Sequence, residues 1–252
     1  MTLVIDIGNT RIKWGRAESG KLIATGSALH IESIDAALNA LFSALPEGID
    51  DVLVANVAGE AMASRLAARL LERCGVKPRF VATETARFGI RCGYDDPAQL
   101  GVDRWVAMIA AHRLAGGAVC VIDAGTAVTF DVLDPAGRHL GGLIFAGPRI
   151  IANALDRGTD RIGSTADART RPHGLDLLGT STADAVGHGG MLGLAAALDA
   201  AATAVESALG VAPTVLLTGG DAQVLQTWLE TEVQLRADLV LEGLAFMTGN
   251  RA

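Results

Sequence analysis

The feature that most constrains the fold of this chain is a repeat within it. The segment Leu3-Val-Ile-Asp-Ile-Gly-Asn-Thr10 returns as Cys120-Val-Ile-Asp-Ala-Gly-Thr-Ala127. Each copy is a short apolar run that ends in an aspartate, followed after one residue by a glycine, and each leads into a stretch of alternating polarity. This pattern is typical of a buried strand, a tight turn and an antiparallel partner strand.

The elements that follow each copy come in the same order. Apolar spacing predicts a third strand, then a helix and a strand, a second helix and strand, and a last helix. The expected segments are 22–24, 34–45, 51–56, 62–70 and 79–82 in the first half, and 140–145, 191–205, 214–218, 224–229 and 233–235 in the second. An insertion at about 146–183 interrupts the second half, and Gly116-Gly117 is the natural boundary. The sequence therefore predicts an α/β protein with two duplicated domains, 1–116 and 117–252, each a mixed sheet with flanking helices.

Composition excludes several classes of protein. Half of the 252 residues are apolar and 19% are charged, which supplies a sizeable core and excludes a disordered chain. The net charge of −7 makes nucleic acid an unlikely partner. Charged residues, glycine or proline interrupt each apolar run before it reaches the length of a membrane span, and Met1–Asp6 does not resemble a signal peptide. Three widely spaced cysteines (Cys74, Cys92 and Cys120) favour a reducing compartment, so we expect a cytoplasmic protein.

The two repeated turns are candidates for binding phosphate and metal. Each would present one carboxylate at a strand end, Asp6 or Asp123, beside backbone N–H groups that a glycine leaves accessible. Amides of this kind hold phosphate oxygens, and carboxylates hold the Mg²⁺ that accompanies them. For either aspartate alone, a turn cap is the simpler explanation. Two aspartates in matched buried-strand contexts favour function, with the turns facing each other across a cleft between the domains.

Other motifs do not carry chemistry of their own. The segment Gly15–Lys21 resembles a P-loop, but Leu22 follows where a hydroxyl is needed and strands are expected on both sides, so it predicts a hairpin loop. The glycines of Gly187–Gly193 are expected to let the start of a helix pack closely. The five histidines show no metal-ligand spacing. An arginine cluster in the insertion is expected to be a solvated loop or a subunit contact: Arg157, Arg161, Arg169 and Arg171.

The densest remaining polar segment runs from Tyr94 to Trp105. Asp103 and Arg104 would open a helix whose inner face is apolar. An acid in the first turn of a helix interacts favourably with the helix dipole, which is one explanation for Asp103. The position equally suits a general base directed into a cleft, with Arg104 beside it to bind a carboxylate through its guanidinium fork. The residues alone leave both explanations open.

Four motifs in this order give the chain a family resemblance. They are Asp6-Ile-Gly-Asn-Thr10 with Lys13, Gly101-Val-Asp-Arg104, Asp123-Ala-Gly-Thr-Ala127 and Gly219-Gly-Asp221. Together they resemble type III pantothenate kinase, a member of the acetate-and-sugar-kinase/Hsp70/actin superfamily, along essentially the whole chain. The resemblance implies two ribonuclease-H-like domains with the active cleft between them. It also implies transfer of phosphate from ATP to pantothenate, the first step of coenzyme A synthesis.

The resemblance also implies roles for individual residues. Asp103 would be the catalytic base, and Asp123 would help hold a monovalent cation, K⁺ or NH₄⁺. ATP and its Mg²⁺, the latter on Asp6, would be bound by Asp6, Ile7, Gly8, Asn9, Thr10, Arg11, Ile12, Lys13, Thr126, Gly219 and Gly220. Pantothenate would be bound by Tyr94, Gly101, Val102, Asp103, Arg104 and Thr182. Family members are dimers in which the partner subunit closes the pantothenate pocket, so a homodimer is expected.

Two positions depart from the family pattern. Ala146 stands where the family commonly has proline, and Ser181 stands where it often has Asn or Asp before Thr182. Neither change removes a catalytic group. Two other functions remain as alternatives: a non-catalytic regulator of the Bvg accessory factor type, and a superfamily kinase for another small hydroxylated or carboxylate substrate.

Overall fold

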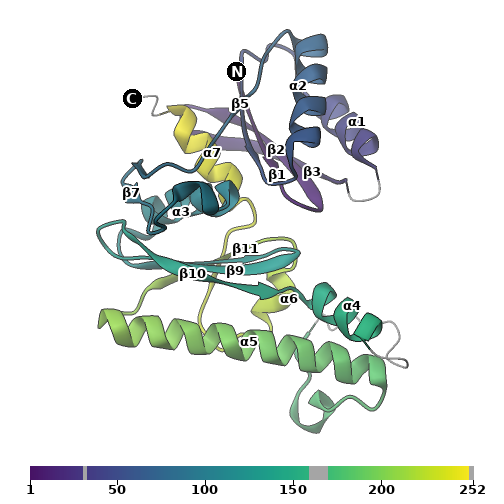
Figure 1. The fold of residues 1–252 in the computed structure, drawn as a ribbon, viewed down its shortest axis with the longest axis vertical. Helices are drawn as coiled ribbons and strands as arrows, with labels where there is room; N and C mark the ends of the chain where they lie inside the picture. The colour runs from purple at the N-terminus through teal and green to yellow at the C-terminus, as the bar shows by residue number, and fades with distance from the viewer. Residues whose placement is uncertain (31–32, 159–169, 250–252) are drawn as a thin grey trace. The chain divides into compact units, whose positions relative to one another are not determined.

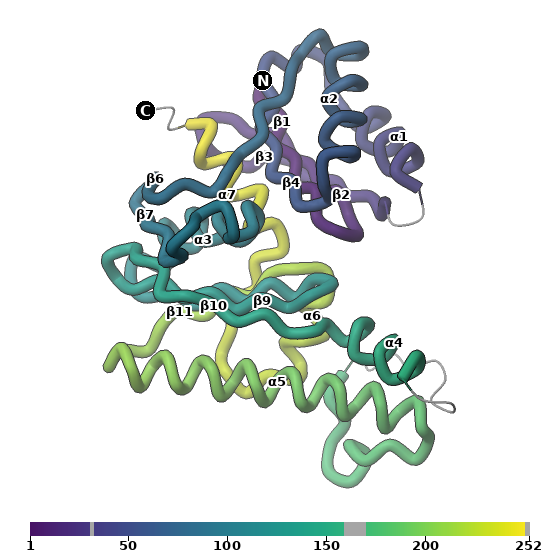
Figure 2. The backbone as a smooth tube through the Cα atoms, viewed as in Figure 1, coloured from purple at the N-terminus to yellow at the C-terminus, as the bar shows by residue number. Residues whose placement is uncertain are grey.

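A computed structural model describes residues 1–30, 33–158 and 170–249 of the chain. The chain forms two compact units, one made of Met1–Leu114 with the segment from Asp238 onward, the other of Ala115–Ala237. Figures 1 and 2 follow the chain through both units. Each unit is described by itself below.

The first unit is built on a five-stranded sheet with the order β3-β2-β1-β4-β5. Its strands are β1 (Thr2–Ile7), β2 (Arg11–Glu18), β3 (Lys21–Leu29), β4 (Asp51–Asn56) and β5 (Arg79–Phe80). β1 pairs antiparallel with β2 and parallel with β4. The P-loop-like segment is the β2–β3 hairpin, as predicted, and its turn at Ser19 and Gly20 has positive φ at both residues.

The second unit repeats this sheet, in the order β10-β9-β8-β11-β12. Its strands are β8 (Val119–Ala124), β9 (Ala127–Leu133), β10 (His139–Ala146), β11 (Thr214–Thr218) and β12 (Gln234–Leu235). β8 pairs antiparallel with β9 and parallel with β11, as β1 does with β2 and β4. The predicted duplication, with one mixed sheet in each half, is confirmed.

Helices cover both faces of the first sheet. Leu38 and Leu41 of α1 (Ile34–Ala44) and Leu66 and Leu70 of α2 (Glu60–Cys74) are fully buried against one face. Helix α7 (Leu239–Gly249) contacts β1, β2, β3 and β4. The same unit contains α3 (Val102–Ala115), the hairpin β6 (Ala86–Arg87) and β7 (Ile90–Arg91), and the 3₁₀ turn η1 (Pro97–Gln99).

The place of α7 differs from the domain division expected from the sequence. The sequence predicts that the segment from Asp238 belongs to the second domain, but it packs with the first unit. Val4 and Leu53 lie on the face of the first sheet opposite α1 and α2 and are nearly fully buried, so this face needs an apolar cover. Helix α7 supplies that cover with seven buried residues, and a Cβ on its Gly243 would lie 2.3 Å from the Val106 carbonyl oxygen of α3.

The second sheet packs against the long helix α5 (Thr182–Leu209), which runs along one of its faces in Figure 1. Met191, Leu194 and Leu198 of α5 enter the core of this unit. By length and composition α5 is also apolar enough to cross a membrane, and it is the single helix in the described ranges that passes this test. Five of its 28 residues are buried, and these pack against the sheet.

The insertion supplies α4 (Pro148–Gly158) and the 3₁₀ helix η2 (Gly174–Leu177), and α6 (Ala222–Gln226) follows β11. Arg161 and Arg169 of the predicted arginine cluster lie outside the described residues. Gly187–Gly193 lies inside α5 rather than at a helix start, because α5 already begins at Thr182. Close packing is nevertheless the role of Gly190, where a Cβ would lie 3.4 Å from Ile151 of α4.

Candidate active site

The first repeated turn places a carboxylate opposite an ammonium group. Asp6 of β1 and Lys13 of β2 are directly paired across the antiparallel ladder. Directly opposite residues project to the same face of a sheet. Ile5 and Ile7 belong to the core with α1 and α2, so Asp6 and Lys13 project to the other face, where α7 packs. The spacing of Asp6 and Lys13 in the sequence thus yields a pair of charges side by side at the end of β1.

A residue that sequence analysis missed completes this charge cluster. Asp238 precedes α7, its backbone carbonyl accepts the Glu242 N–H, and its Oδ1 lies 3.6 Å from Lys13 Nζ. The side chains are 21% exposed for Lys13 and 30% for Asp238. An acid before the apolar run Leu239–Leu241 could be recognised from the sequence as a helix cap. Its role as a partner of Lys13 depends on α7 crossing to the first sheet.

The acceptor residues predicted around α3 do come together. The Gly101 carbonyl accepts the Trp105 N–H, which starts α3, and Asp103 Oδ1 accepts the Arg104 backbone N–H at 2.8 Å. A Cβ at Gly101 would lie 2.6 Å from Asp103 Oδ1, so a larger residue at this position would displace the carboxylate. Arg104 is only 8% exposed, and its Nη1 donates to the Tyr94 hydroxyl at 3.2 Å.

Arg104 and Tyr94 also make a cation–π contact. The guanidinium carbon lies 5.7 Å from the centroid of the Tyr94 ring, a distance at which a cation is attracted by an aromatic face. The loop between them is tied down at both ends. Asp96 caps η1 by accepting the Ala98 N–H, and Thr83 Oγ1 donates to the Leu100 carbonyl at 2.8 Å. The buried arginine is therefore held by a loop that is itself fixed by hydrogen bonds.

In the second unit the structure brings Asp123 and the Gly219 turn together. A Cβ at Gly219 would lie 2.5 Å from Asp123 Oδ1 and from the Ala124 carbonyl oxygen. The Asp221 N–H donates to that same carbonyl at 2.9 Å. Gly219 has φ of +101°, a conformation that side-chain-bearing residues rarely adopt. Two motifs about 100 residues apart therefore form one contact at the ends of β8 and β11.

Thr126 lies next to the end of β10. The Gly147 N–H donates to the Thr126 carbonyl at 3.2 Å, and a Cβ at Gly147 would lie 2.3 Å from the same oxygen. A glycine is thus required at position 147 by the close approach of the Thr126 backbone. Ala146, which replaces the proline, ends β10 directly before it.

Thr182 is the first residue of α5. Ser181, the departure noted above, caps this helix: its Oγ accepts the Asp184 N–H at 3.1 Å and donates to Asp184 Oδ2 at 2.7 Å. Serine is as good a cap as Asn or Asp, so the helix start is preserved. Thr182 shares the second unit with Asp123 and Thr126, whereas the Asp6 turn and the Tyr94–Arg104 group belong to the first.

Among the other His, Cys, Asp and Glu side chains, those at the following positions make structural contacts. In the described ranges no three His, Cys, Asp or Glu side chains gather to hold a metal. His139 Nε2 and Asp131 Oδ1 are 3.0 Å apart in the interior of the second unit. Burial raises the pKa of the Cys120 thiol to about 12, so it is protonated at neutral pH and is no nucleophile.

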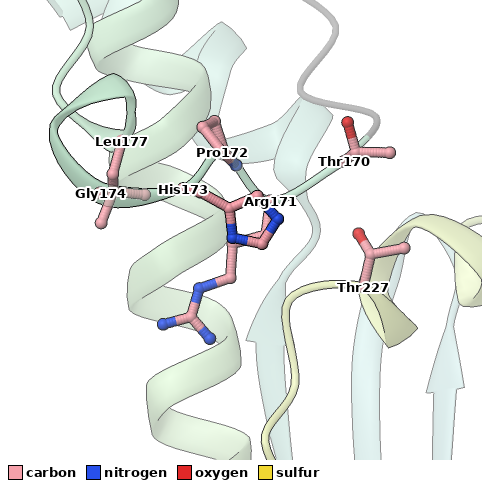
Figure 3. A pocket seen from close by; sticks show the side chains of 7 residues that line it. All are labelled: Thr170, Arg171, Pro172, His173, Gly174, Leu177 and Thr227. Atoms are coloured by element: carbon pink, nitrogen blue, oxygen red, sulfur yellow. The ribbon is translucent and has the colours of Figure 1, made fainter.

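A cavity of about 550 Å³ lies in the second unit, beside the insertion. Its lining side chains are shown in Figure 3: Thr170, Arg171, Pro172, His173, Gly174, Leu177 and Thr227. Arg171 Nη1 is 3.2 Å from Glu230 Oε1, so this guanidinium is already paired with an acid. None of the predicted site residues lines this cavity.

Comparison with known proteins gives the same family from a family model and from individual relatives. Residues 2–204 match the family model for type III pantothenate kinase. The type III pantothenate kinase of Alkalilimnicola ehrlichii is 39% identical, covering 96% of each chain. That of Nitrosococcus oceani is 34% identical over 97% of this chain and 92% of its own.

Solved structures share the fold at lower identity. A conserved putative Baf family transcriptional activator from Campylobacter jejuni is 21% identical with a TM-score of 0.60, covering 99% of this chain and 98% of its own. A putative 2-dehydro-3-deoxygalactonokinase from Sinorhizobium meliloti is 20% identical with a TM-score of 0.54, covering 98% of this chain and 99% of its own. These likenesses concern the fold and support the expected pair of ribonuclease-H-like domains.

Proposed function

Because the chain belongs to the type III pantothenate kinase family, we propose that it transfers the γ-phosphoryl group of ATP to the primary hydroxyl of pantothenate. The observation that carries the assignment of roles is the group Tyr94, Asp103 and Arg104, which places a carboxylate beside a buried, oriented guanidinium. Arg104 would bind the pantothenate carboxylate, and Asp103 would take the proton from the attacking hydroxyl.

The turn between β1 and β2 would hold the nucleotide phosphates. Lys13 supplies a positive charge, residues 7–12 surround the phosphates with backbone N–H groups such as that of Asn9, and Asp6 supplies an oxygen ligand. Mg²⁺ is commonly held by one or two carboxylates together with substrate phosphates, which fits a site with few protein ligands. When bound there, Mg²⁺ neutralises charge on the phosphates. Thr126 and the Gly219–Gly220 turn are further proposed contacts of ATP.

An assay of ADP release tests this function directly. We expect ADP only when pantothenate, ATP and Mg²⁺ are all present, with 4'-phosphopantothenate formed in equal amount. Activity on a sugar or acetate but not on pantothenate would favour another superfamily kinase. No turnover with any acceptor would favour a regulator of the Bvg accessory factor type. Retention of Asp6, Asp103, Arg104 and Asp123 supports a catalyst rather than a binding protein.

We also propose that the enzyme acts in the cytoplasm.

We expect K⁺ or NH₄⁺ to activate the enzyme more than Na⁺ does. The reason is Asp123, which matches the position of the family's cation ligand and whose Oδ1 lies against the backbone at Gly219. Initial rates in potassium, ammonium and sodium chloride at equal ionic strength provide the measurement. Equal rates in the three salts would contradict the prediction, and so would an Asp123→Ala enzyme that keeps the same cation response.

We expect the smallest active unit to be a homodimer. None of the residues in α4 is buried, and Ile150 and Leu155 on it are 39% and 38% exposed, while Ile144 on β10 is 64% exposed. A further exposed row of small residues follows α5 at spacings of three or four: Ala185, Gly189, Gly193, Ala196, Ala200 and Ala204. Contiguous exposed apolar surface commonly marks an interaction site, so we propose that these residues contribute to the dimer interface.

Sedimentation equilibrium at assay concentrations tests the dimer. The interface should bury at least roughly 1,200 Å² in total, because stable protein interfaces rarely bury less. Ile144→Asp with Ile150→Asp should yield monomers that bind pantothenate poorly, since the partner is proposed to close that pocket. Leu71→Asp serves as the control, because Leu71 is an exposed leucine of the first unit, 48% exposed on α2. A fully active monomer would refute this prediction.

A further inference from the structure

We propose that His30 is a positioning residue that holds the β1–β2 turn in the conformation that binds the ATP phosphates. This inference rests on the proposed phosphate site. His30 directly follows β3 and is 8% exposed. Its imidazole Nε2 lies 2.7 Å from the Gly8 carbonyl oxygen, and its backbone N–H donates to the Thr10 carbonyl at 2.9 Å. One residue therefore contacts the turn at two carbonyl groups.

These two contacts orient two peptide planes. In a trans peptide the carbonyl and the following N–H point in opposite directions, and the described chain has no cis peptide bonds. The Gly8 carbonyl shares its plane with the Asn9 N–H, and the Thr10 carbonyl shares its plane with the Arg11 N–H. Holding both carbonyls toward His30 directs both N–H groups away from it. Asn9 and Arg11 belong to the segment proposed to surround the phosphates.

The turn needs such an anchor because Gly8 is conformationally free. Glycine populates more backbone conformations than other residues, and only the Arg11 carbonyl would lie within 4 Å of a Cβ at Gly8. The Gly8 N–H donates to that Arg11 carbonyl at 3.1 Å, which fixes the N–H group of Gly8. The carbonyl group of Gly8 is fixed by its contact with His30. A carbonyl oxygen only accepts hydrogen bonds, so Nε2 carries the hydrogen in this contact.

Substitutions at His30 separate this role from simple packing. His30→Leu keeps the buried volume but removes the donor, and we expect it to raise the KM for MgATP about tenfold. The KM for pantothenate should stay within about twofold of the wild type, because the acceptor group around Arg104 does not involve His30. His30→Gln places an amide nitrogen near the position of Nε2, so we expect it to recover most of the affinity. His30→Asn reaches only as far as Nδ1 and should behave like leucine.

Two measurements without turnover complete the test. Calorimetry should show an approximately tenfold weaker binding of ADP by His30→Leu and normal binding by His30→Gln. Hydrogen exchange should show faster exchange at residues 8–11 in His30→Leu without nucleotide, since the turn has lost an anchor. If His30→Leu does not fold, His30→Asn replaces it in the comparison with His30→Gln, because asparagine also lacks a donor at the position of Nε2. His188→Leu is the matched control, because His188 Nδ1 makes the same kind of contact, 3.0 Å from the Leu177 carbonyl in the other unit.

The outcomes distinguish this inference from the proposed phosphate site. Lys13→Met tests the site itself, and an unchanged KM for ATP in that variant would mean that the phosphates bind elsewhere. If Lys13→Met weakens ATP binding but His30→Leu does not, the role of His30 is refuted alone. The same holds if His30→Leu raises both KM values equally, or if glutamine fails to restore ATP binding. Each of these results assigns His30 to general stability.

Discussion

Replacing Asp103 with asparagine should lower kcat by about 10²–10⁴-fold while the KM values change little. Asparagine cannot accept the proton of the pantothenate hydroxyl, and that interaction exists mainly in the transition state. The fold should persist, because an asparagine oxygen can still accept the Arg104 backbone N–H that Asp103 Oδ1 accepts now at 2.8 Å. Steady-state kinetics and a thermal melt of the same preparation provide the measurement.

The competing explanation of Asp103, an acid that stabilises the start of α3, predicts a different result. In that case asparagine would cost well under about 1 kcal/mol of stability, because it is well tolerated at a helix start, and kcat would be nearly unchanged. Arg104→Lys is the internal control. Lysine keeps the charge but loses the guanidinium fork and the guanidinium contacts with Tyr94, so it should mainly raise the KM for pantothenate. A folded, saturable Asp103→Asn enzyme with normal kcat would eliminate the proposed base.

Replacing Gly219 with alanine should destabilise the protein by about 2–4 kcal/mol. The added Cβ would lie 2.5 Å from the Asp123 carboxylate and the Ala124 carbonyl, at a φ of +101° that strains any side chain. Because Asp123 would be displaced, we also expect a reduced response to K⁺. Urea denaturation and rates with and without potassium provide the measurements.

Gly220→Ala is a control one residue away. A Cβ at Gly220 would meet nothing within 4 Å, and its φ lies outside the positive range, so we expect a change within about 0.5 kcal/mol. If both substitutions destabilise the protein equally, the effect comes from glycine entropy rather than from contact with Asp123. If neither does, the close approach of the β11 turn to Asp123 has no energetic consequence.

Local patterns in the sequence were sufficient for the two sheets. Apolar runs that end in Asp-x-Gly predicted β1 and β8 and their partner strands, because burial on both faces and the turn that follows are encoded within about ten residues. The acceptor group could be predicted for the same reason. Tyr94, Asp103 and Arg104 lie within ten residues of one another, and a helix start brings them together.

Such local patterns could not predict contacts between residues that are far apart in the sequence. The periodicity of 239–249 predicts an apolar helix, but it does not say which sheet that helix covers, since any apolar face can satisfy it. Only the fold shows that α7 covers the first sheet and so places Asp238 at Lys13. His30 is a similar case, because a histidine after a strand carries no local signal for a bond to the Gly8 carbonyl.

The sequence by itself determined the duplicated α/β plan, the two aspartate-bearing turns and the short acceptor segment, because each depends on hydrophobic periodicity and on neighbours close along the chain. The tertiary structure decided which distant groups contact those turns: Asp238 lies beside Lys13, His30 contacts the Gly8 carbonyl, and Gly219 lies against Asp123. The physical reason is that these contacts join elements 20 to more than 200 residues apart. Their geometry is set by how the sheets and helices pack, which no local pattern encodes.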